Sequence, residues 1–345
     1  MKFSFSLPIL RDLTARDPYR QTFELARIAE EAGFDTATTG HHHFMFGNMS
    51  DPLTFLATVA ARTETLRVGT GIFQLPIHNP VRVAEQVATI DEISGGRISL
   101  GVGLGWWDLE YQVHGSNIRQ RGARMEECLE ILRLVWSQEN TSYEGRFYSF
   151  PELTVYPRPV QKPSIPLWVA GVADSAVDRA ARLGDAWMCG PVQSLTRAKS
   201  CLELYRKRRA ELGKPDDFVL RRYAWLAPNR RVVEEEVLPN YVAGLVEHWR
   251  ESVEEEEEME LFRRMDAGEN VTIDEIARDR LIYGDPDDVI AQIQRYRDET
   301  GCEHIHMAFG AGLPANTKSE ATLGSFEDHA EMIRLFGREV IPAFR

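Results

Sequence analysis

The sequence predicts a (β/α)8 barrel, and three observations support this fold class. Eight short apolar runs lie along the 345 residues, and they have the composition of parallel strands buried on both faces. Segments with helical periodicity separate these runs. Most of the strand exits contain glycine, as expected where the backbone passes close to a ligand. The length fits such a barrel as one domain, and a doubly wound open sheet is the alternative.

Four of the predicted strands lie in the first third of the chain, in runs rich in apolar, β-branched or alternating residues: 2–7, 34–39, 67–72 and 97–102. The helices between them should start where an aspartate or asparagine precedes a proline, at Asp17, Asp51 and Asn79. A side-chain oxygen can cap free N–H groups there, and proline suits the first turn. Glycines at positions 33 and 95 should end two of these helices.

The rest of the chain continues the pattern, with a helix at 122–137, a hairpin at 141–150 and strands at 167–170, 186–189, 218–226 and 304–309. Helices are expected after Gly171, around 198–212, after Asp285 and at 325–336. Residues 234–280 break this rhythm, with five consecutive glutamates and few apolar stripes. We interpret them as a solvated helical insertion or lid before the last strand, within a single domain of residues 1–345.

Composition limits the classes of function. A net charge of -13 argues against a nucleic-acid or anionic-membrane partner. No segment approaches the about 20 apolar residues of a membrane span, and the first residues read as a strand rather than a signal peptide. The four cysteines have no metal-type spacing. We therefore expect a cytoplasmic protein.

Three consecutive histidines follow the second strand. In strand geometry His41 and His43 point one way and His42 the other. One interpretation is a single histidine that exchanges a proton with a bound cofactor or substrate. A metal pair at His41 and His43 would need further ligands, and only His304 and His306 on the last strand could supply them. We assign no metal, and polar loop histidines without a function are the third interpretation.

Two other strand exits could hold parts of a ligand. Residues 171–175 join a strand to a helix, and N–H groups at a helix start together with the Ser175 hydroxyl suit a phosphate. An ordinary serine cap is the alternative for Ser175. The aromatic residues Phe44, Phe73 and Trp107 indicate an apolar pocket or a stacking surface for a ring system, or else packing of loops against the barrel rim.

Four stretches of the chain carry a family likeness. They read RVGTGIFQLPIHNPVRVAEQVATIDEISGGRISLGVGLGWW at 67–107, HHF at 42–44, PLWVAGVADSAVDRAARLGDAWM at 166–188 and YGDPDDVIAQIQRYRDETG at 283–301. Through them the chain resembles the luciferase-like flavin-dependent monooxygenases, and specifically the alkanal monooxygenase (bacterial luciferase) branch. The resemblance implies a barrel that binds reduced FMN (FMNH2). Its reaction with O2 gives a flavin C4a-hydroperoxide, which oxygenates an apolar organic substrate.

The resemblance also implies roles for individual residues. His42 falls on the catalytic histidine of the family, and a non-proline cis peptide falls on Gly71-Ile72. The residues expected to bind the cofactor are Gly71, Ile72, Gly103, Gly171, Val172, Ser175 and Met188, of which Gly171, Val172 and Ser175 form the phosphate loop. The residues expected to line the substrate pocket are Phe44, Phe73, Trp107 and Tyr111.

Partners follow from the same resemblance. A separate NAD(P)H:flavin reductase would supply FMNH2, and the lack of a GxGxxG fingerprint fits this division of labour. A homodimer is also implied. One alternative is an F420-dependent oxidoreductase of the same superfamily, which would transfer hydride without O2. Its anionic cofactor tail calls for a basic rim, which the loops after the fourth and fifth strands lack. The other alternative is a non-catalytic flavin-binding subunit.

Overall fold

The computed structural model describes residues 1–345 except 13, 46–47, 192, 239–255 and 310–323. The chain divides into two compact units. Unit 1 comprises Met1–Asp35, Cys189–Leu202 and Val219–Arg345, and unit 2 comprises Thr36–Met188 and Glu203–Phe218. Parallel strands and helices build both units.

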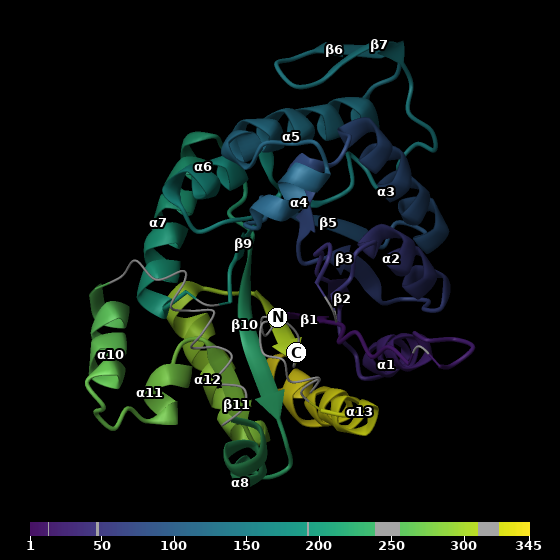
Figure 1. The fold of residues 1–345 in the computed structure, drawn as a ribbon. Coiled ribbons are helices and arrows are strands. Elements are labelled where there is room, and N and C mark those ends of the chain that lie inside the picture. Colours follow the sequence, from purple (N-terminus) through teal and green to yellow (C-terminus); the bar gives the residue numbers. More distant parts are fainter. Residues whose placement is uncertain (13, 46–47, 192, 239–255, 310–323) are drawn as a thin grey trace. The chain divides into compact units, whose positions relative to one another are not determined.

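The sheet of unit 2 carries the segments that matter for the site. Its parallel strands are neighbours in the order β2 (Thr36–Thr39), β3 (Arg67–Thr70), β5 (Ile98–Gly103), β8 (Leu167–Ala170) and β9 (Ala186–Cys189). The short β4 (Phe73–Gln74) also pairs with β5. In Figure 1 the helices α2 (Pro52–Ala61), α3 (Pro80–Ser94) and α5 (Arg121–Ser137) lie around β3 and β5.

Several shorter elements connect these strands and helices. They are η1 (Leu75–Ile77), α4 (Asp108–Val113), η2 (Ile118–Gln120), the antiparallel hairpin β6 (Thr141–Glu144) and β7 (Ser149–Leu153), α6 (Asp174–Leu183), and α7 (Leu195–Glu211), which has residues in both units. The predicted hairpin and the predicted helices of this region are confirmed, with bounds that differ by a few residues.

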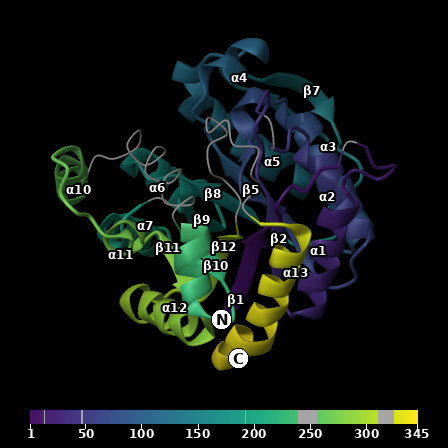
Figure 2. The ribbon, with the colours of Figure 1, turned by 60° about the horizontal axis from the view of Figure 1, so that its bottom comes forward.

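Unit 1 has its own run of parallel strands, in the order β11 (Leu281–Gly284), β10 (Phe218–Leu226), β12 (His304–Phe309) and β1 (Lys2–Ser6). In Figure 2 the helices α12 (Pro286–Thr300) and α13 (Phe326–Leu335) flank these strands. The remaining elements are α1 (Arg20–Glu31), α8 (Arg230–Val232), η3 (Val233–Val237), α10 (Glu256–Asp266), α11 (Ile273–Ala277), η4 (Phe336–Val340) and η5 (Ile341–Phe344). The core of unit 1 contains an aromatic cluster, with Phe34 packed on Phe5, Phe309 and Phe336.

All eight predicted strands are present, and the predicted (β/α)8 barrel class is confirmed. The strands β4 and β11 were not predicted: β4 has only two residues, and β11 directly follows the segment that was interpreted as an insertion. The predicted insertion at 234–280 is partly helical: α10 and α11 share a small apolar cluster that includes Phe262 and Ile276. Residues 239–255 lie outside the described part of the chain, so the insertion stays a prediction.

Three of the four predicted aspartate- or asparagine-proline helix starts are confirmed. The side chains of Asp51, Asn79 and Asp285 accept hydrogen bonds from backbone N–H groups of α2, α3 and α12. The start at Asp17 was wrong: α1 begins at Arg20, and the Arg20 N–H donates to the Asp17 carbonyl oxygen in a turn. Within the described residues, no helix is both long enough and apolar enough to cross a membrane.

The half-buried His304 of β12 gives the fold a pH dependence. Burial, assisted by the charge of Lys2, lowers the pKa of His304 to about 3. The unfolded value is about 6.5, so the unfolded chain binds the additional proton between these two values. The stability that a neutral His304 contributes is therefore present above pH 6.5 and is lost as the pH falls toward 3.

We expect His304→Gln to reduce the acid sensitivity of the fold. The shift of the urea midpoint between pH 7 and pH 4 should be smaller in this variant than in the wild type. The control is Ser4→Ala, because the Ser4 hydroxyl contacts Nε2 of His304 at 3.0 Å but does not titrate. Ser4→Ala should keep the full acid sensitivity, and equal shifts in the wild type and His304→Gln would contradict the assignment.

Candidate active site

The predicted site residues all lie in unit 2, on segments at the carboxyl ends of neighbouring parallel strands. His42 follows β2, Gly71 and Ile72 follow β3, Gly103 ends β5, the segment 171–175 follows β8, and Met188 lies in β9. Because the carboxyl ends of parallel strands share one edge of a sheet, these segments are arranged along one edge of unit 2.

His42 is held by a buried carboxylate. Its Nδ1 lies 3.3 Å from Oε1 of Glu110, and the side chain of Glu110 is 0% exposed while that of His42 is 25% exposed. The same Oε1 accepts the backbone N–H of His43 at 2.7 Å. Glu110 comes from α4, so two segments far apart in sequence fix this loop together.

The side chain of Gln74 decides the tautomer of His42. Its amide nitrogen donates to the carbonyl oxygen of His41 at 2.9 Å and to Oε1 of Glu110 at 3.0 Å. These bonds use both amide hydrogens, so the 3.2 Å approach of the same nitrogen to Nδ1 of His42 is not a third hydrogen bond. The proton between His42 and Glu110 therefore belongs to Nδ1 of His42, which leaves Nε2 with a free lone pair.

Glu110 is ionised in this environment. Burial would raise its pKa, but hydrogen bonds from His42, the His43 N–H and Gln74 outweigh burial and hold the pKa below its usual value. A buried negative charge next to Nδ1 stabilises a proton on that atom and fixes the orientation of the ring. The geometry therefore presents Nε2 of His42 as a hydrogen-bond acceptor or base.

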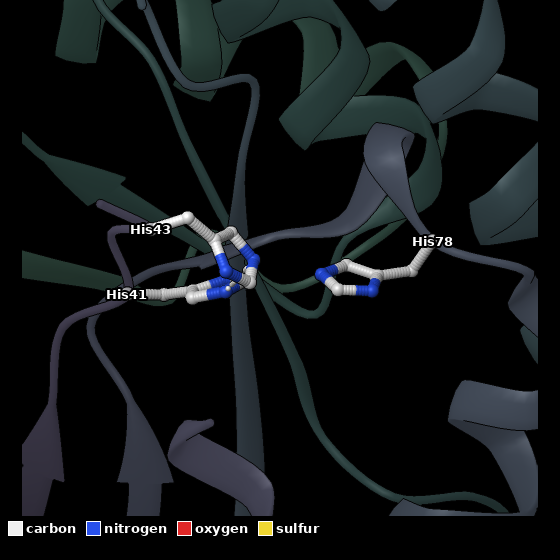
Figure 3. Close-up of side chains that lie close together, drawn as sticks. All are labelled: His41, His43 and His78. Carbon is white, nitrogen blue, oxygen red and sulfur yellow. Dashed lines mark hydrogen bonds between the residues drawn. The ribbon is translucent and has the colours of Figure 1, made fainter. Parts of the chain in front are cut away.

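The histidines on either side of His42 point the other way, as the strand pattern predicted. Nε2 of His41 lies 2.9 Å from Nε2 of His43, and both nitrogens face His78, which follows η1 (Figure 3). The buried Phe73 stacks on His41 and on His78, with ring centroids 4.8 Å and 4.6 Å apart. Phe73 therefore supports the histidines from within the unit.

The remaining predicted pocket residues divide into an exposed group and a buried one. Phe44 is 56% exposed and contacts Trp107 edge to face, and the neighbouring Trp106 is 50% exposed and contacts the ring of His42. Tyr111 is fully buried, and its hydroxyl donates to the carbonyl oxygen of Leu104. Trp106 therefore lies beside His42 and Phe44 beside His43, whereas Tyr111 holds the loop after β5 in place.

The peptide bond between Gly71 and Ile72 is cis, as predicted. The N–H of Gly71 donates to the carbonyl oxygen of Thr39 at 2.9 Å, which ties this loop to the end of β2. A Cβ atom on Gly103 would lie 2.9 Å from Cδ1 of Ile72. The absence of a side chain at Gly103 therefore makes room for Ile72, and these two predicted cofactor-binding residues are in contact.

The predicted phosphate loop lies at the start of α6. A Cβ on Gly171 would be 2.3 Å from Cβ of Ala176, so glycine is needed for this close packing of loop and helix. The indole N–H of Trp187 donates to the Gly171 carbonyl oxygen at 2.8 Å. The serine-cap alternative was wrong: Ala173 is the N-cap, and Ser175 is the exposed second residue of the helix.

Sequence reasoning missed Gln74, His78 and Glu110. Gln74 lies two residues after the predicted third strand, and Glu110 lies in a polar segment where nothing marks it as buried. A buried face of α4 that includes Glu110 and Tyr111 would have been a signal, but six residues are too few to show a period. His78 stands next to a predicted helix cap and has no pattern of its own.

Comparisons with known proteins found a matching family and matching solved structures. A family model described as luciferase-like monooxygenase matches residues 1–304. A solved structure, a monooxygenase from Streptomyces bottropensis, superposes with a TM-score of 0.81 at 25% identity and covers 100% of both chains. This match also supports the barrel fold.

Curated relatives include enzymes that use two different cofactors. The chain is 32% identical to the oxygenase component of a flavin-dependent trigonelline monooxygenase of Acinetobacter baylyi, over 49% of each chain. It is 26% identical to an F420-dependent glucose-6-phosphate dehydrogenase of Amycolatopsis mediterranei, over 94% of this chain and 95% of the relative. The aligned part of the chain spans about half the length of the first two curated relatives, 47% and 49%.

Proposed function

Because the chain belongs to the luciferase-like monooxygenase family, we propose that it is a flavin-dependent monooxygenase that uses reduced FMN and O2 to oxygenate an apolar organic substrate. The relatives named as flavin-dependent or FMNH2-dependent monooxygenases support this proposal over nearly half of the chain or more. The observation that carries it is the arrangement of His42, which is anchored at Nδ1 by Glu110 and contacts the exposed ring of Trp106.

The residues of the site fit a flavin. Two buried acceptors, Oε1 of Gln74 and Oε2 of Glu110, have no hydrogen-bond partner among the described residues. Buried polar atoms without partners are costly, and a bound ring system with N–H groups would satisfy them. The start of α6, where the cap residue Ala173 has no side-chain acceptor, suits a phosphate. Gly71, Ile72, Gly103 and Met188 would contact the ring system.

Reduced FMN supplies the electrons that activate O2. The protein contributes a proton acceptor or hydrogen-bond partner at Nε2 of His42, in the tautomer that Glu110 and Gln74 fix. Phe44, Trp106 and Trp107 supply apolar surface for a substrate and exclude water when it is bound. A separate NAD(P)H:flavin reductase and a homodimeric assembly are part of the proposal, and the relative named as an oxygenase component supports the reductase.

An F420-dependent oxidoreductase is the second candidate. The relative of this type aligns over 94% of the chain, a longer alignment than with the trigonelline monooxygenase component. An experiment with isotopically labelled O2 separates the monooxygenase from the F420-dependent oxidoreductase. The chain is incubated with FMNH2 and with panels of aldehydes, ketones and aromatic compounds. Label in a product supports the monooxygenase, and hydride transfer to or from F420 without O2 supports the alternative. Turnover by the isolated chain would exclude a non-catalytic subunit.

We expect Glu110→Gln to lower turnover about ten- to hundred-fold, the range for loss of a side chain that orients a functional histidine. The substitution keeps the size of the side chain but removes the charge that favours the proton on Nδ1 of His42. The binding constant for FMN should change much less than turnover. The control is Glu126→Gln, because Glu126 is also a carboxylate of unit 2 but pairs with Arg179 on the helices. Equal turnover of Glu110→Gln and the wild type would contradict the role.

A further inference from the structure

Arg222 of β10 is a fully buried cation that the proposed monooxygenase does not use. Its side chain is 0% exposed, and its Nη1 donates to the carbonyl oxygens of Arg221 at 2.8 Å and of Gly190 at 3.4 Å. Its Nε and Nη2 have no hydrogen-bond partner among the described residues. We propose that Arg222 binds a small, planar, monovalent oxyanion, of the size of formate or nitrate, inside unit 1.

The two unpartnered nitrogens of Arg222 lie on the same edge of its guanidinium group. The group is planar and rigid, and the N–H of Nε and one N–H of Nη2 are parallel along this edge. A planar oxyanion has two oxygens at a matching spacing and accepts both hydrogens at once. A chloride ion has a single centre and cannot accept each hydrogen along its own axis. The geometry therefore favours an oxyanion over a halide.

Within the described part of the chain, no anionic group neutralises Arg222. The titratable side chains that act most strongly on it are Tyr296 and Cys189. Burial raises the pKa of the Cys189 thiol and that of the Tyr296 hydroxyl, so both are neutral at physiological pH. The guanidinium carbon lies 5.1 Å from the centre of the Tyr296 ring, a cation–π contact that leaves the charge in place. A guanidinium does not lose its proton in proteins, so Arg222 needs a counter-ion.

A second buried arginine shows that burial alone does not produce unpartnered nitrogens. Arg209 is 3% exposed, and each of its three side-chain nitrogens donates to at least one backbone carbonyl oxygen. In Arg222 only Nη1 is bonded in this way. The difference indicates that the other edge of Arg222 has a partner that is not part of the chain segments described by the structure.

The groups around Arg222 all belong to unit 1. Tyr296 comes from α12, and Cys189 is the last residue of β9. Arg222 and Arg221 point to opposite faces of β10, because side chains alternate along a strand. His42 and the other predicted site residues lie in unit 2. The anion proposal therefore does not rest on the proposed monooxygenase activity.

Buried water is the competing explanation. Water molecules often occupy polar positions inside proteins and would accept hydrogen bonds from Nε and Nη2 of Arg222. Water carries no charge, however, and a buried cation without a counter-charge is strongly unfavourable. The water explanation predicts that the stability of the chain does not depend on which anion is present, whereas the anion proposal predicts that it does.

The test measures the free energy of unfolding of the full chain in urea, while sodium formate replaces the bulky morpholinoethanesulfonate salt at constant ionic strength. We expect this free energy to rise with formate, because an anion that binds only the folded chain stabilises it, and to rise less with chloride. Arg222→Met should weaken the apparent affinity for formate by at least about ten-fold, the loss expected when hydrogen bonds to a charged group are removed.

Two further variants serve as controls. Arg338→Met removes an exposed arginine of unit 1 that pairs with Glu339, and it should keep the full response to formate. Arg222→Lys keeps the charge but lacks the two parallel N–H groups. We therefore expect Arg222→Lys to respond to formate and chloride alike.

Three results would overturn the proposal. They are a wild-type stability that is equal in formate and in the bulky anion, an equal response of the wild type to formate and chloride, and an equal formate response in the wild type and Arg222→Met. Circular dichroism shows whether each variant is folded, and uncharged replacements of buried charges are often tolerated. Should Arg222→Met fail to fold, Arg222→Lys decides, because an unchanged preference for formate over chloride in that variant would exclude the guanidinium edge as the site.

Discussion

His42→Ala should lower turnover with FMNH2 and O2 by about 10²–10⁴-fold, the usual contribution of a positioned proton donor or acceptor. The reason is that Nε2 of His42 accepts no hydrogen bond from the residues that the structure describes, while Glu110 fixes Nδ1. FMN should still bind, because the loop after β3 and the start of α6 do not depend on the imidazole. Steady-state kinetics and flavin binding by fluorescence quenching measure the two effects separately.

A double-mutant cycle tests whether His42 and Glu110 act as one unit. Glu110→Gln should lower turnover in the wild-type background but add little to His42→Ala, since the carboxylate would act only through the imidazole. His42→Asn provides a control that retains a polar group without a base. Unchanged turnover in His42→Ala, or fully additive losses in the double variant, would remove this pair from the mechanism.

Gly101→Ala should have the largest effect on stability. A Cβ at this position of β5 would lie 2.0 Å from the carbonyl oxygen of Thr70 in β3. The Thr70 hydroxyl already donates to the Gly101 carbonyl oxygen at 2.6 Å, so the two strands cannot separate without losing that bond. Overpacking usually costs about 1–3 kcal/mol, and a backbone atom cannot rotate away, so we expect about 3 kcal/mol or more.

The measurement is equilibrium unfolding in urea, followed by circular dichroism. Gly101→Ala should shift the midpoint to much lower urea or yield no folded protein. Gly40→Ala is the matched control, because a Cβ at Gly40 meets nothing within 4 Å. A midpoint for Gly101→Ala equal to that of Gly40→Ala would show that β3 and β5 are not packed as described.

Much of the fold could be predicted because the caps and turns that delimit its helices depend on residues that are adjacent in the sequence. The cap of α3 is an example: Asn79 and Pro80 determine its start within three residues, and the side chain of Asn79 accepts the N–H groups of Val81 and Arg82. Gly95 ends the same helix with a φ of 64°, which glycine adopts without strain. Asp17 shows the limit of such signals, since the dipeptide Asp17-Pro18 forms a turn before the helix.

The candidate site depends on contacts that no local pattern contains. Along the chain, Glu110 is 68 residues from His42, and Gln74 is 32 residues from it, yet both approach the same ring nitrogen. His78 joins His41 and His43 in the same way, from the far end of a short turn of helix. A sequence shows that such residues exist, but their proximity depends on which strands are neighbours and on the rotamers that the core allows.

Sequence alone therefore determined the eight predicted strands, most of the helix starts and the histidine that follows β2, because hydrophobic period, capping and turn chemistry act over a few residues. The tertiary structure decided which tautomer His42 has and which histidines lie together. Both depend on hydrogen bonds between distant segments, and the buried partners Gln74 and Glu110 acquire their roles only when the parallel strands bring their ends together.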